Sequence, residues 1–227
     1  MQASEARAGA PMDRPDDREA IARLLRARRT SKVLAAPDDA PIGGNVDRAV
    51  VDAMLADAAH APFHYPHPDR DAAASAVPWR ATKLDGPACR ALAARAERAE
   101  LPIGSVARML RAADGLVLVW FTPEGEASDG EVFAGSERNL EHVAAAGAFA
   151  QSFLLAATAA GRRTYWSSGG VLRAAPVTDW LDVPDGDVLV GALFLFPTET
   201  GTAEVKDGKW RDGRGEVADW SRWHGGT

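Results

Sequence analysis

The sequence contains very little cysteine, since Cys89 is the one cysteine among its 227 residues. A single thiol excludes an internal disulfide and makes a cysteine metal cluster implausible. No apolar run reaches the length of about 20 residues that a membrane-spanning helix requires, and residues 1–16 hold charges and prolines rather than the apolar stretch of a secretory signal. We therefore expect a cytoplasmic protein without a membrane partner, in which residues 1–16 form a flexible lead-in.

The motifs of several common enzyme classes are missing as well. Ser167 and Ser168 do not lie in a G-x-S-x-G pattern, which argues against a hydrolase nucleophile. No G-x-G-x-x-G follows a predicted strand, which argues against a Rossmann fold. His60 and His64 are separated by Pro62, which breaks the helix that would bring them to one face, and they lack strict ligand spacing. The sequence thus predicts neither a metal site nor a catalytic triad.

Acidic residues outnumber basic ones, 32 to 26, which gives a formal net charge of −6. Such a balance argues against nucleic acid as a general partner, so any anion must be bound at a local basic site. The hydrophobic fraction of 46% is ample for one core. We expect residues 17–227 to form a single domain.

The distribution of apolar residues predicts helices interleaved with buried strands. Helices are expected at residues 17–29, from Asn45 onward, and at 87–100, 104–111 and 138–160, and strands at 79–84, 116–121 and 188–196. The last two strands are continuously apolar, which is typical of strands buried on both faces. One side of the longest helix is expected to be lined by small and apolar residues, namely Leu140, Val143, Gly147, Ala150 and Leu154. Together these elements indicate an α+β sandwich, a sheet with helices on both sides.

The most informative local feature is the basic run RRTSK at residues 28–32, which follows the first predicted helix. Three cations and two hydroxyls meet there near the free backbone groups of a helix end. Guanidinium groups grip phosphate oxygens in bidentate fashion, and hydroxyls add neutral donors, so the run is suited to a phosphate. The alternative is a solvated basic helix end that complements the helix dipole.

Six segments, in the same order along the chain, resemble motifs of the nitroreductase family of flavin enzymes. RRTSK resembles the opening RRS-x-R/K motif, and APFH with the later PWR resembles the AP-x-H…QPW loop. The alanine-rich helix, the YWSSG sequence, the VGAL strand and the tail RDGRGEVADWSRW resemble four further elements. The segments are residues 28–32, 61–64 with 78–80, 141–161, 165–169, 190–193 and 211–223.

The resemblance implies a nitroreductase-like fold, with a central, mostly antiparallel sheet flanked by helices. It also implies a homodimer with one FMN at each of two subunit-interface sites. The C-terminal extension, about residues 198–227, would be swapped onto the partner subunit. Its three tryptophans, Trp210, Trp220 and Trp223, indicate by themselves that the extension packs, either on its own domain or around a second copy, because large indoles are rarely left in an unpacked tail.

The resemblance also supplies roles for residues around the FMN phosphate. Arg28, Thr30 and Arg211 would hold the phosphate, and Arg29 would lie in its surroundings. Such a set is chemically reasonable, because an ionised phosphate in a net-acidic protein needs about two cationic neighbours.

A second group of residues would surround the flavin ring. Lys32 would face the polar edge of the ring, where a cation stabilises negative charge on the reduced flavin and raises its reduction potential. His64 would touch the cofactor from the proline-rich loop. Trp166, Ser167 and Ser168 would offer backbone groups to the ring.

The implied activity is that of an FMN-dependent oxidoreductase. NADH or NADPH would deliver hydride to the flavin, and a small acceptor such as a nitroaromatic, a quinone or an enone would then be reduced. Two departures motivate an alternative, a non-catalytic protein of the same fold that binds or sequesters FMN. Val77 stands where relatives have Asn or Gln, and residues 67–76 are an insertion. A third possibility is a dimer that has lost flavin altogether.

Overall fold

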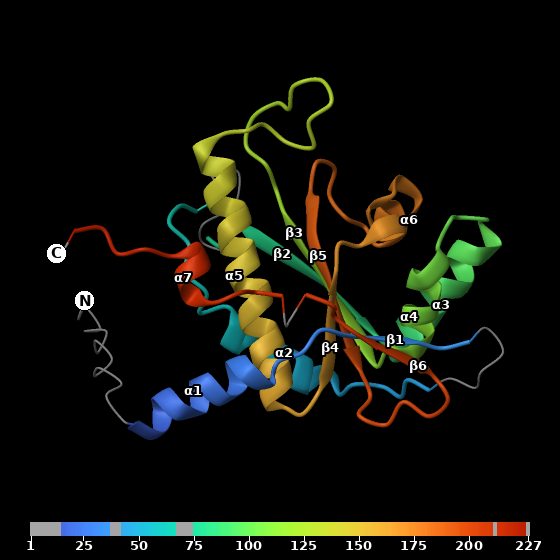
Figure 1. Cartoon of the computed structure of the whole chain (residues 1–227). Coiled ribbons are helices and arrows are strands. Elements are labelled where there is room, and N and C mark those ends of the chain that lie inside the picture. The colour runs from blue at the N-terminus through green and yellow to red at the C-terminus, as the bar shows by residue number, and fades with distance from the viewer. Residues whose placement is uncertain (1–14, 37–41, 67–74, 211–212, 226–227) are drawn as a thin grey trace, which may run out of the picture.

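The central sheet is built on the two long apolar runs of the sequence. In the computed structural model, which describes residues 15–36, 42–66, 75–210 and 213–225, these runs form β3 (Gly115–Phe121) and β5 (Val188–Phe196). They are the middle strands of a four-stranded sheet with the order β2-β3-β5-β4. The edge strands are β2 (Trp79–Asp85) and β4 (Arg163–Ser167), and every neighbouring pair is antiparallel. The predicted antiparallel α+β fold is confirmed (Figure 1).

Helices cover both faces of this sheet, so the structure is a sandwich. Side chains of a strand alternate between faces, and in β3 Trp120 packs with one apolar cluster while Val119 packs with the other. The first cluster includes α3 (Gly86–Arg98) and α4 (Gly104–Ala112). The second includes α2 (Arg48–Ala58) and α5 (Glu137–Ala159). Three further short helical segments are η1 (Gly170–Arg173), α6 (Ala175–Trp180) and α7 (Val217–Trp220).

Cys89 is fully buried on α3, as a small core thiol would be. Burial raises the pKa of this thiol to about 12, because the thiolate is poorly solvated there. The residue is therefore a packing element, without the thiolate that redox or nucleophilic chemistry requires.

The N- and C-terminal parts of the chain meet in a second sheet that the sequence did not indicate. In it, β1 (Ser31–Leu34) pairs antiparallel with β6 (Glu204–Asp207). The first helix, α1 (Pro15–Ala27), consequently ends before residue 29, where the pattern had placed its end. Local spacing predicted that the helix continues into the basic run. The Arg28 N–H still donates to the Leu24 carbonyl, but from Thr30 onward the chain pairs with β4 and β6 as extended backbone.

The buried side of α5 differs from the predicted one. Leu140 is 68% exposed, while Ala150 and Leu154 are buried as expected. The buried stripe begins instead with two polar residues, Asn139 and His142. Apolar periodicity predicted the wrong face at this end of the helix. It does not identify polar side chains that can be buried because hydrogen bonds satisfy them.

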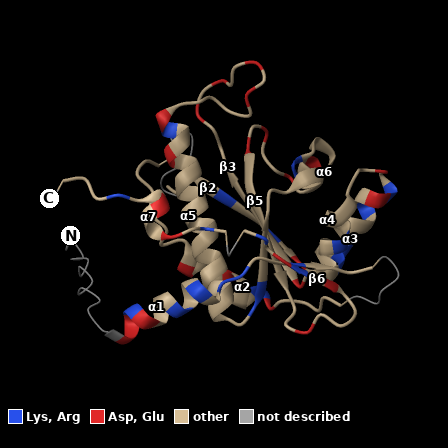
Figure 2. Cartoon of the chain, in the orientation of Figure 1, with Lys and Arg blue, Asp and Glu red and all other residues tan. Residues whose placement is uncertain are grey.

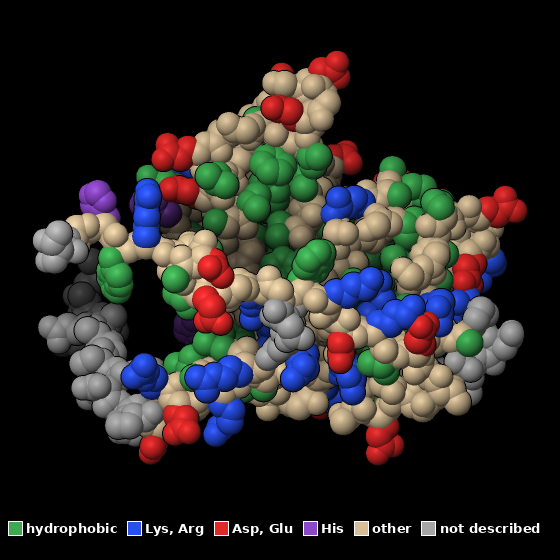
Figure 3. Space-filling model, viewed as in Figure 1, with side chains coloured by type: hydrophobic (Ala, Val, Ile, Leu, Met, Phe, Trp, Pro, Cys, Tyr) green, Lys and Arg blue, Asp and Glu red, His purple; other side chains and the backbone are tan. Residues whose placement is uncertain are grey.

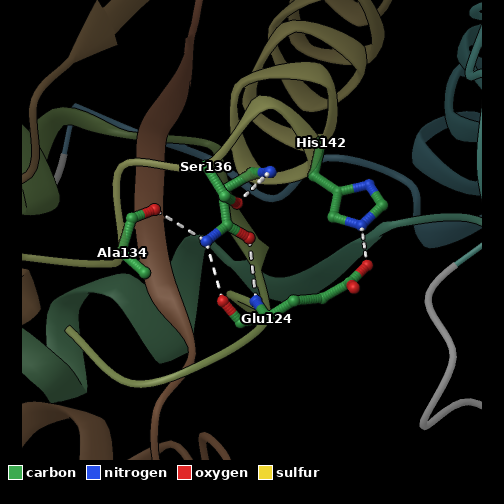
Figure 4. A network of polar contacts seen from close by, with 5 residues as sticks. Glu124, Ala134, Ser136 and His142 are labelled. Carbon is green, nitrogen blue, oxygen red and sulfur yellow. Dashed lines mark hydrogen bonds and ion pairs between the residues drawn. The ribbon is translucent and has the colours of Figure 1, made fainter.

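Asn139 and His142 fix the loop that connects β3 to α5 (Figure 4). Asn139 Nδ2 donates to the carbonyls of Glu124 and Ala134 at 2.9 and 2.8 Å, and its Oδ1 accepts from the Glu124 N–H at 2.8 Å. Ser136 caps α5 by accepting from the Asn139 N–H at 3.1 Å. His142 Nε2 lies 2.7 Å from a carboxylate oxygen of Glu124.

The start of α2 also differs from the prediction. Asp47, rather than Asn45, caps the helix, with its carboxylate accepting from the Ala49 N–H at 2.9 Å. Val51 and Met54 face the core, whereas Val50 is exposed. The buried stripe of α2 runs through Val51, Met54 and Ala58.

By length and composition, α5 is the one helix among the described residues that could cross a membrane. Its buried stripe packs against the central sheet, with Phe149 and Phe153 almost without exposed surface. This packing is that of a core helix, and core helices meet the same length and composition criteria.

Replacing Asn139 tests the importance of the loop anchor. We expect Asn139→Ala to lower the free energy of unfolding by about 3 kcal/mol, because each buried group left without its partner costs about 1–3 kcal/mol. Denaturant titration measures the effect. The exposed neighbour Glu137, as Glu137→Ala, is the matched control and should change stability by no more than about 0.5 kcal/mol. Equal effects of the two variants would contradict this role for Asn139.

Candidate functional site

A basic cavity lies where the two ends of the chain meet. It has a volume of about 400 Å³ and is lined by Arg28, Arg29 and Thr30 from the start of the chain and by Asp207, Gly208, Trp210 and Arg214 from its end. We call it the basic cavity. The β1–β6 pairing brings these segments together, because Ser31 lies opposite Asp207 in the register. In the cartoon of Figure 2, blue segments that mark Lys and Arg positions lie along α1 and near the β1–β6 pair.

Positive charge dominates this cavity. Three guanidinium groups, those of Arg28, Arg29 and Arg214, line it together with one carboxylate, that of Asp207. The carboxylate accepts a hydrogen bond from Ser31 Oγ, which partly satisfies it. Arg28 Nη1 donates to Thr30 Oγ1 at 3.2 Å, so the guanidinium and the hydroxyl lie side by side. Figure 3 shows a band of Lys and Arg side chains across this face of the molecule. The cavity is therefore suited to an anion with several oxygen acceptors.

A second cavity, which we call the aromatic cavity, adjoins the basic one. Its volume is about 350 Å³, and Lys32, Tyr165, Trp166, Lys206 and Lys209 line it. The two cavities share four lining residues, which are Thr30, Asp207, Gly208 and Trp210. One ligand with an anionic end and a flat ring could therefore extend from one cavity into the other.

Two lysines lie close together at the edge of the aromatic cavity. Lys32 lies directly opposite Lys206 in the β1–β6 ladder, and like charges at such positions destabilise a sheet. Lys206 pairs with Glu204 at 2.8 Å, and Lys32 Nζ lies 5.1 Å from the centroid of the Tyr165 ring. An electron-rich ring bound beside Lys32 would offset the repulsion between the two lysines.

Two glycines allow the cavity walls to approach closely. The Gly208 N–H donates to the Thr30 carbonyl at 2.8 Å, and a Cβ at this position would lie 3.3 Å from the Thr30 Cβ. A Cβ at Gly191 would lie 2.2 Å from Trp166 Nε1. The glycine of the VGAL sequence is thus required for the Trp166 indole to lie against β5, with which β4 pairs.

Strand β1 is held in place by a single arginine of α4. Arg108 Nε donates to the Ala35 carbonyl at 3.1 Å, and its Nη2 donates to the Leu34 carbonyl at 3.3 Å. The backbone N–H of Ala35 in turn donates to the Arg108 carbonyl at 3.2 Å. These bonds fix the end of the short strand whose other end carries the cavity residues.

The structure brings together five of the nine residues that the sequence analysis assigned to cofactor binding. Arg28, Arg29 and Thr30 line the basic cavity, and Lys32 and Trp166 line the aromatic cavity. The sixth, Arg211, lies outside the described residues.

Three assigned residues line neither of these cavities. His64 Nδ1 lies 3.2 Å from Glu141 Oε1, and the centroid of its ring lies 4.1 Å from that of Tyr65, with the two rings tilted by 35°. Ser167 Oγ accepts from the Gly169 N–H at 3.1 Å, and the Ser168 carbonyl accepts from Arg173. His64 would reach the same ligand only across an interface with a partner subunit. Ser167 and Ser168 would reach it only through their backbone, which follows Trp166.

Several residues of the two cavities were not assigned from the sequence. They are Tyr165, Lys206, Lys209, Trp210 and Arg214. Arg214 had a signal, because it replaces the Leu of the resembled tail motif with a cation. No sequence signal identified Lys206, because all four residues of β6 are exposed and the strand has no strong apolar alternation.

Another cavity of about 400 Å³ lies between α2, β2 and α3, but its charges are compensated. Arg48 pairs with Asp85 at 2.5 Å, and Lys83 pairs with Asp52 at 2.6 Å. The hydrogen bond from Arg48 holds the pKa of Asp85 below its usual range. Among the described residues no group of three or more His, Cys, Asp or Glu side chains could hold a metal ion.

Comparisons with known proteins agree with this architecture. Among solved structures, the nitroreductase-like family protein from Bacillus cereus is 22% identical, with 91% of this chain and 96% of that chain covered and a TM-score of 0.59. The nitroreductase family protein from Streptococcus pneumoniae is 18% identical, with 90% and 100% covered and a TM-score of 0.59. The FMN-dependent nitroreductase NfnB from Mycobacterium smegmatis, solved with NADPH, is 14% identical, with 92% and 100% covered and a TM-score of 0.58.

At these identities the structures show a shared fold. No curated protein matches the chain significantly. The sequence model of the nitroreductase family, however, matches residues 44–195, which is more than half of the chain and includes β2, β3, α5, β4 and most of β5. The chain belongs to the nitroreductase family.

Proposed function

We propose that the protein is an FMN-dependent oxidoreductase that transfers hydride from NADH or NADPH to a small acceptor of nitroaromatic, quinone or enone type. The observation that carries the proposal is the junction of the basic cavity with the aromatic cavity. FMN has the matching shape, with a phosphate at one end and a flat ring at the other. The fold shared with an FMN-dependent nitroreductase solved with NADPH supports the same cofactors.

The basic cavity fits the phosphate of FMN. A phosphate with a charge near −2 needs about two cationic partners, and Arg28, Arg29 and Arg214 supply three guanidinium groups. The Thr30 hydroxyl lies within reach of Arg28 and adds a neutral donor. Arg211 is three residues from Arg214, and we propose that it contributes a further cation at the same place.

The aromatic cavity would hold the flavin ring. FMN, when bound, supplies the hydride chemistry, while the protein orients the ring and tunes its reduction potential. Lys32 would stabilise negative charge at the polar edge of the ring and so raise that potential. Trp166 fixes one wall, and the exposed Trp210, 85% accessible in the single chain, could cover the ring.

We also propose a homodimer in which the C-terminal extension lies on the partner subunit. Apolar side chains are exposed on α1, α5 and the tail, where Leu25 is 51%, Leu140 68%, Trp220 67% and Trp223 100% accessible. These three elements lie on one side of the molecule (Figure 1). Large apolar side chains exposed together on one side support the proposal that this side is an interface. A partner subunit would also bring a second copy of His64 toward each cofactor.

A substitution of Arg28 tests the phosphate site. Arg28→Ala should weaken FMN binding by about 1.5–3 kcal/mol, the usual loss for a charged hydrogen bond. Fluorescence titration of the FMN-free protein measures the dissociation constant. Arg98→Ala, an exposed arginine of α3, is the matched control and should leave the constant unchanged. An unchanged constant for Arg28→Ala would remove this residue from the phosphate site.

Steady-state oxidation of NADH and NADPH with nitroaromatic and quinone acceptors tests the activity. We expect turnover with at least one acceptor that depends on bound FMN. Yellow protein without turnover for any acceptor would favour FMN sequestration, which the apolar Val77 beside Pro78 motivates. Protein that stays colourless after FMN is added would contradict both functions.

Sedimentation of a tail variant tests the homodimer. Removal of the exposed indoles in Trp220→Ala with Trp223→Ala should weaken self-association by about 2–4 kcal/mol, since buried tryptophans dominate interfaces. Val132→Ala, which removes an exposed apolar side chain of the loop before α5, serves as the control. A wild-type protein that sediments as a monomer at all concentrations would refute the dimer.

A further inference from the structure

A third, smaller pocket lies behind the basic cavity, where the C-terminal end of α5 meets the start of β4. Its volume is about 200 Å³. Three arginines, Arg29, Arg162 and Arg163, line it, together with hydroxyl residues that include Thr158, Thr164 and Thr198. We call it the arginine pocket. Among the described residues that line it, none is acidic.

Much of the donor capacity of these arginines is unused. The side chains of Arg29 and Arg163 form no hydrogen bond or ion pair with any described residue, and the Nε of Arg163 is buried without a partner. Arg162 makes one long contact, from Nη1 to an Asp114 oxygen at 3.4 Å, and a guanidinium has five N–H donors. The unused N–H donors that line the pocket are therefore suited to an acceptor-rich ligand.

The neighbouring helix end does not account for these arginines. Basic side chains often bind the free carbonyls of a helix C-terminus, but here the last turn of α5 is closed by its own backbone. The Ala160, Gly161 and Arg162 N–H groups donate to the carbonyls of residues 156, 158 and 157, and Thr198 Oγ1 contacts the Gly161 carbonyl. The guanidinium groups are thus not needed as caps.

We propose that the arginine pocket is a second oxyanion site, which binds inorganic phosphate or the phosphate group of a small phosphate ester. Guanidinium forks with adjacent hydroxyls match the oxygens of a tetrahedral oxyanion. The pocket is smaller than the 300–1,000 Å³ or so of typical organic ligand sites, which argues against a whole nucleotide.

The arginine pocket is distinct from the basic cavity, although Arg29 lines both. After α1 the chain is extended, and neighbouring side chains of an extended segment point to opposite sides. Thr30 and Lys32 accordingly line the aromatic cavity, whereas Arg29 and Ser31 line the arginine pocket. Occupation of the arginine pocket would therefore leave Arg28, Thr30 and Arg214 to the FMN phosphate.

Isothermal titration of FMN-saturated protein with inorganic phosphate, in a chloride buffer, tests the proposal. Because FMN blocks the basic cavity, we expect one saturable phosphate site per chain. Arg163→Gln should weaken phosphate binding by about tenfold or more, while Arg98→Gln, on α3, should not change it. Arg162→Gln, which changes an arginine that lines the arginine pocket and not the basic cavity, should have the same effect as Arg163→Gln and serves if that variant does not fold. Glycerol 3-phosphate in a parallel titration distinguishes an ester ligand from free phosphate by its tighter binding.

Absence of saturable binding up to about 10 mM of either compound would overturn the proposal. So would phosphate binding that both arginine variants leave unchanged. If the protein binds no FMN, the same titration is made on FMN-free Arg28→Ala protein. Binding that is lost there but kept in Arg163→Gln would assign the phosphate to the basic cavity and refute a second site, whatever the outcome for the oxidoreductase function.

Discussion

The pairing of β1 with β6 is the interaction on which the candidate site depends. Each strand has four residues, and the ladder joins segments separated by 170 or more positions, as in the bond from Ser31 to Asp207. The bond from the Gly208 N–H to the Thr30 carbonyl extends the ladder by one step. Without this pairing the basic run would be a charged helix end, and no cavity would form between the two ends of the chain.

The central sheet provides the rigid support for this pairing. Thr30 forms a parallel bridge to Thr164 on β4, and Arg108 of α4 holds the other end of β1. Trp166, on the same edge strand, lies against Gly191 of β5. The cavity walls are therefore attached to the buried core, so ligand groups would meet a preformed arrangement of cations and aromatic rings.

The sequence identified the elements whose signal is local. The apolar run 188–196 became β5 with the predicted bounds, and α5 differs by one residue at each end. It did not indicate β1 and β6, because each strand has only four residues and is defined by a long-range partner and not by its own pattern. The buried face of α5 was wrong at its start for a related reason, since Asn139 is buried only through the loop that it binds.

The candidate site was predictable to a similar degree. Arg28, Thr30 and Lys32 followed from one short motif, and the structure places them in adjoining cavities. For Arg214 the sequence offered only a cation in place of a Leu of the resembled tail motif, and the fold was needed to place it beside Arg28. His64 lies outside both cavities, and its assignment to the cofactor depends on a partner subunit.

The central claim is that arginines from both ends of the chain hold the phosphate of a mononucleotide. Parallel titrations of the cofactor-free protein with FMN and with riboflavin, which lacks the phosphate, test it most directly. Two or more charge-assisted hydrogen bonds should make FMN bind more tightly by about 3 kcal/mol or more, which is over a hundredfold in the dissociation constant. Equal affinities for the two flavins would contradict the account.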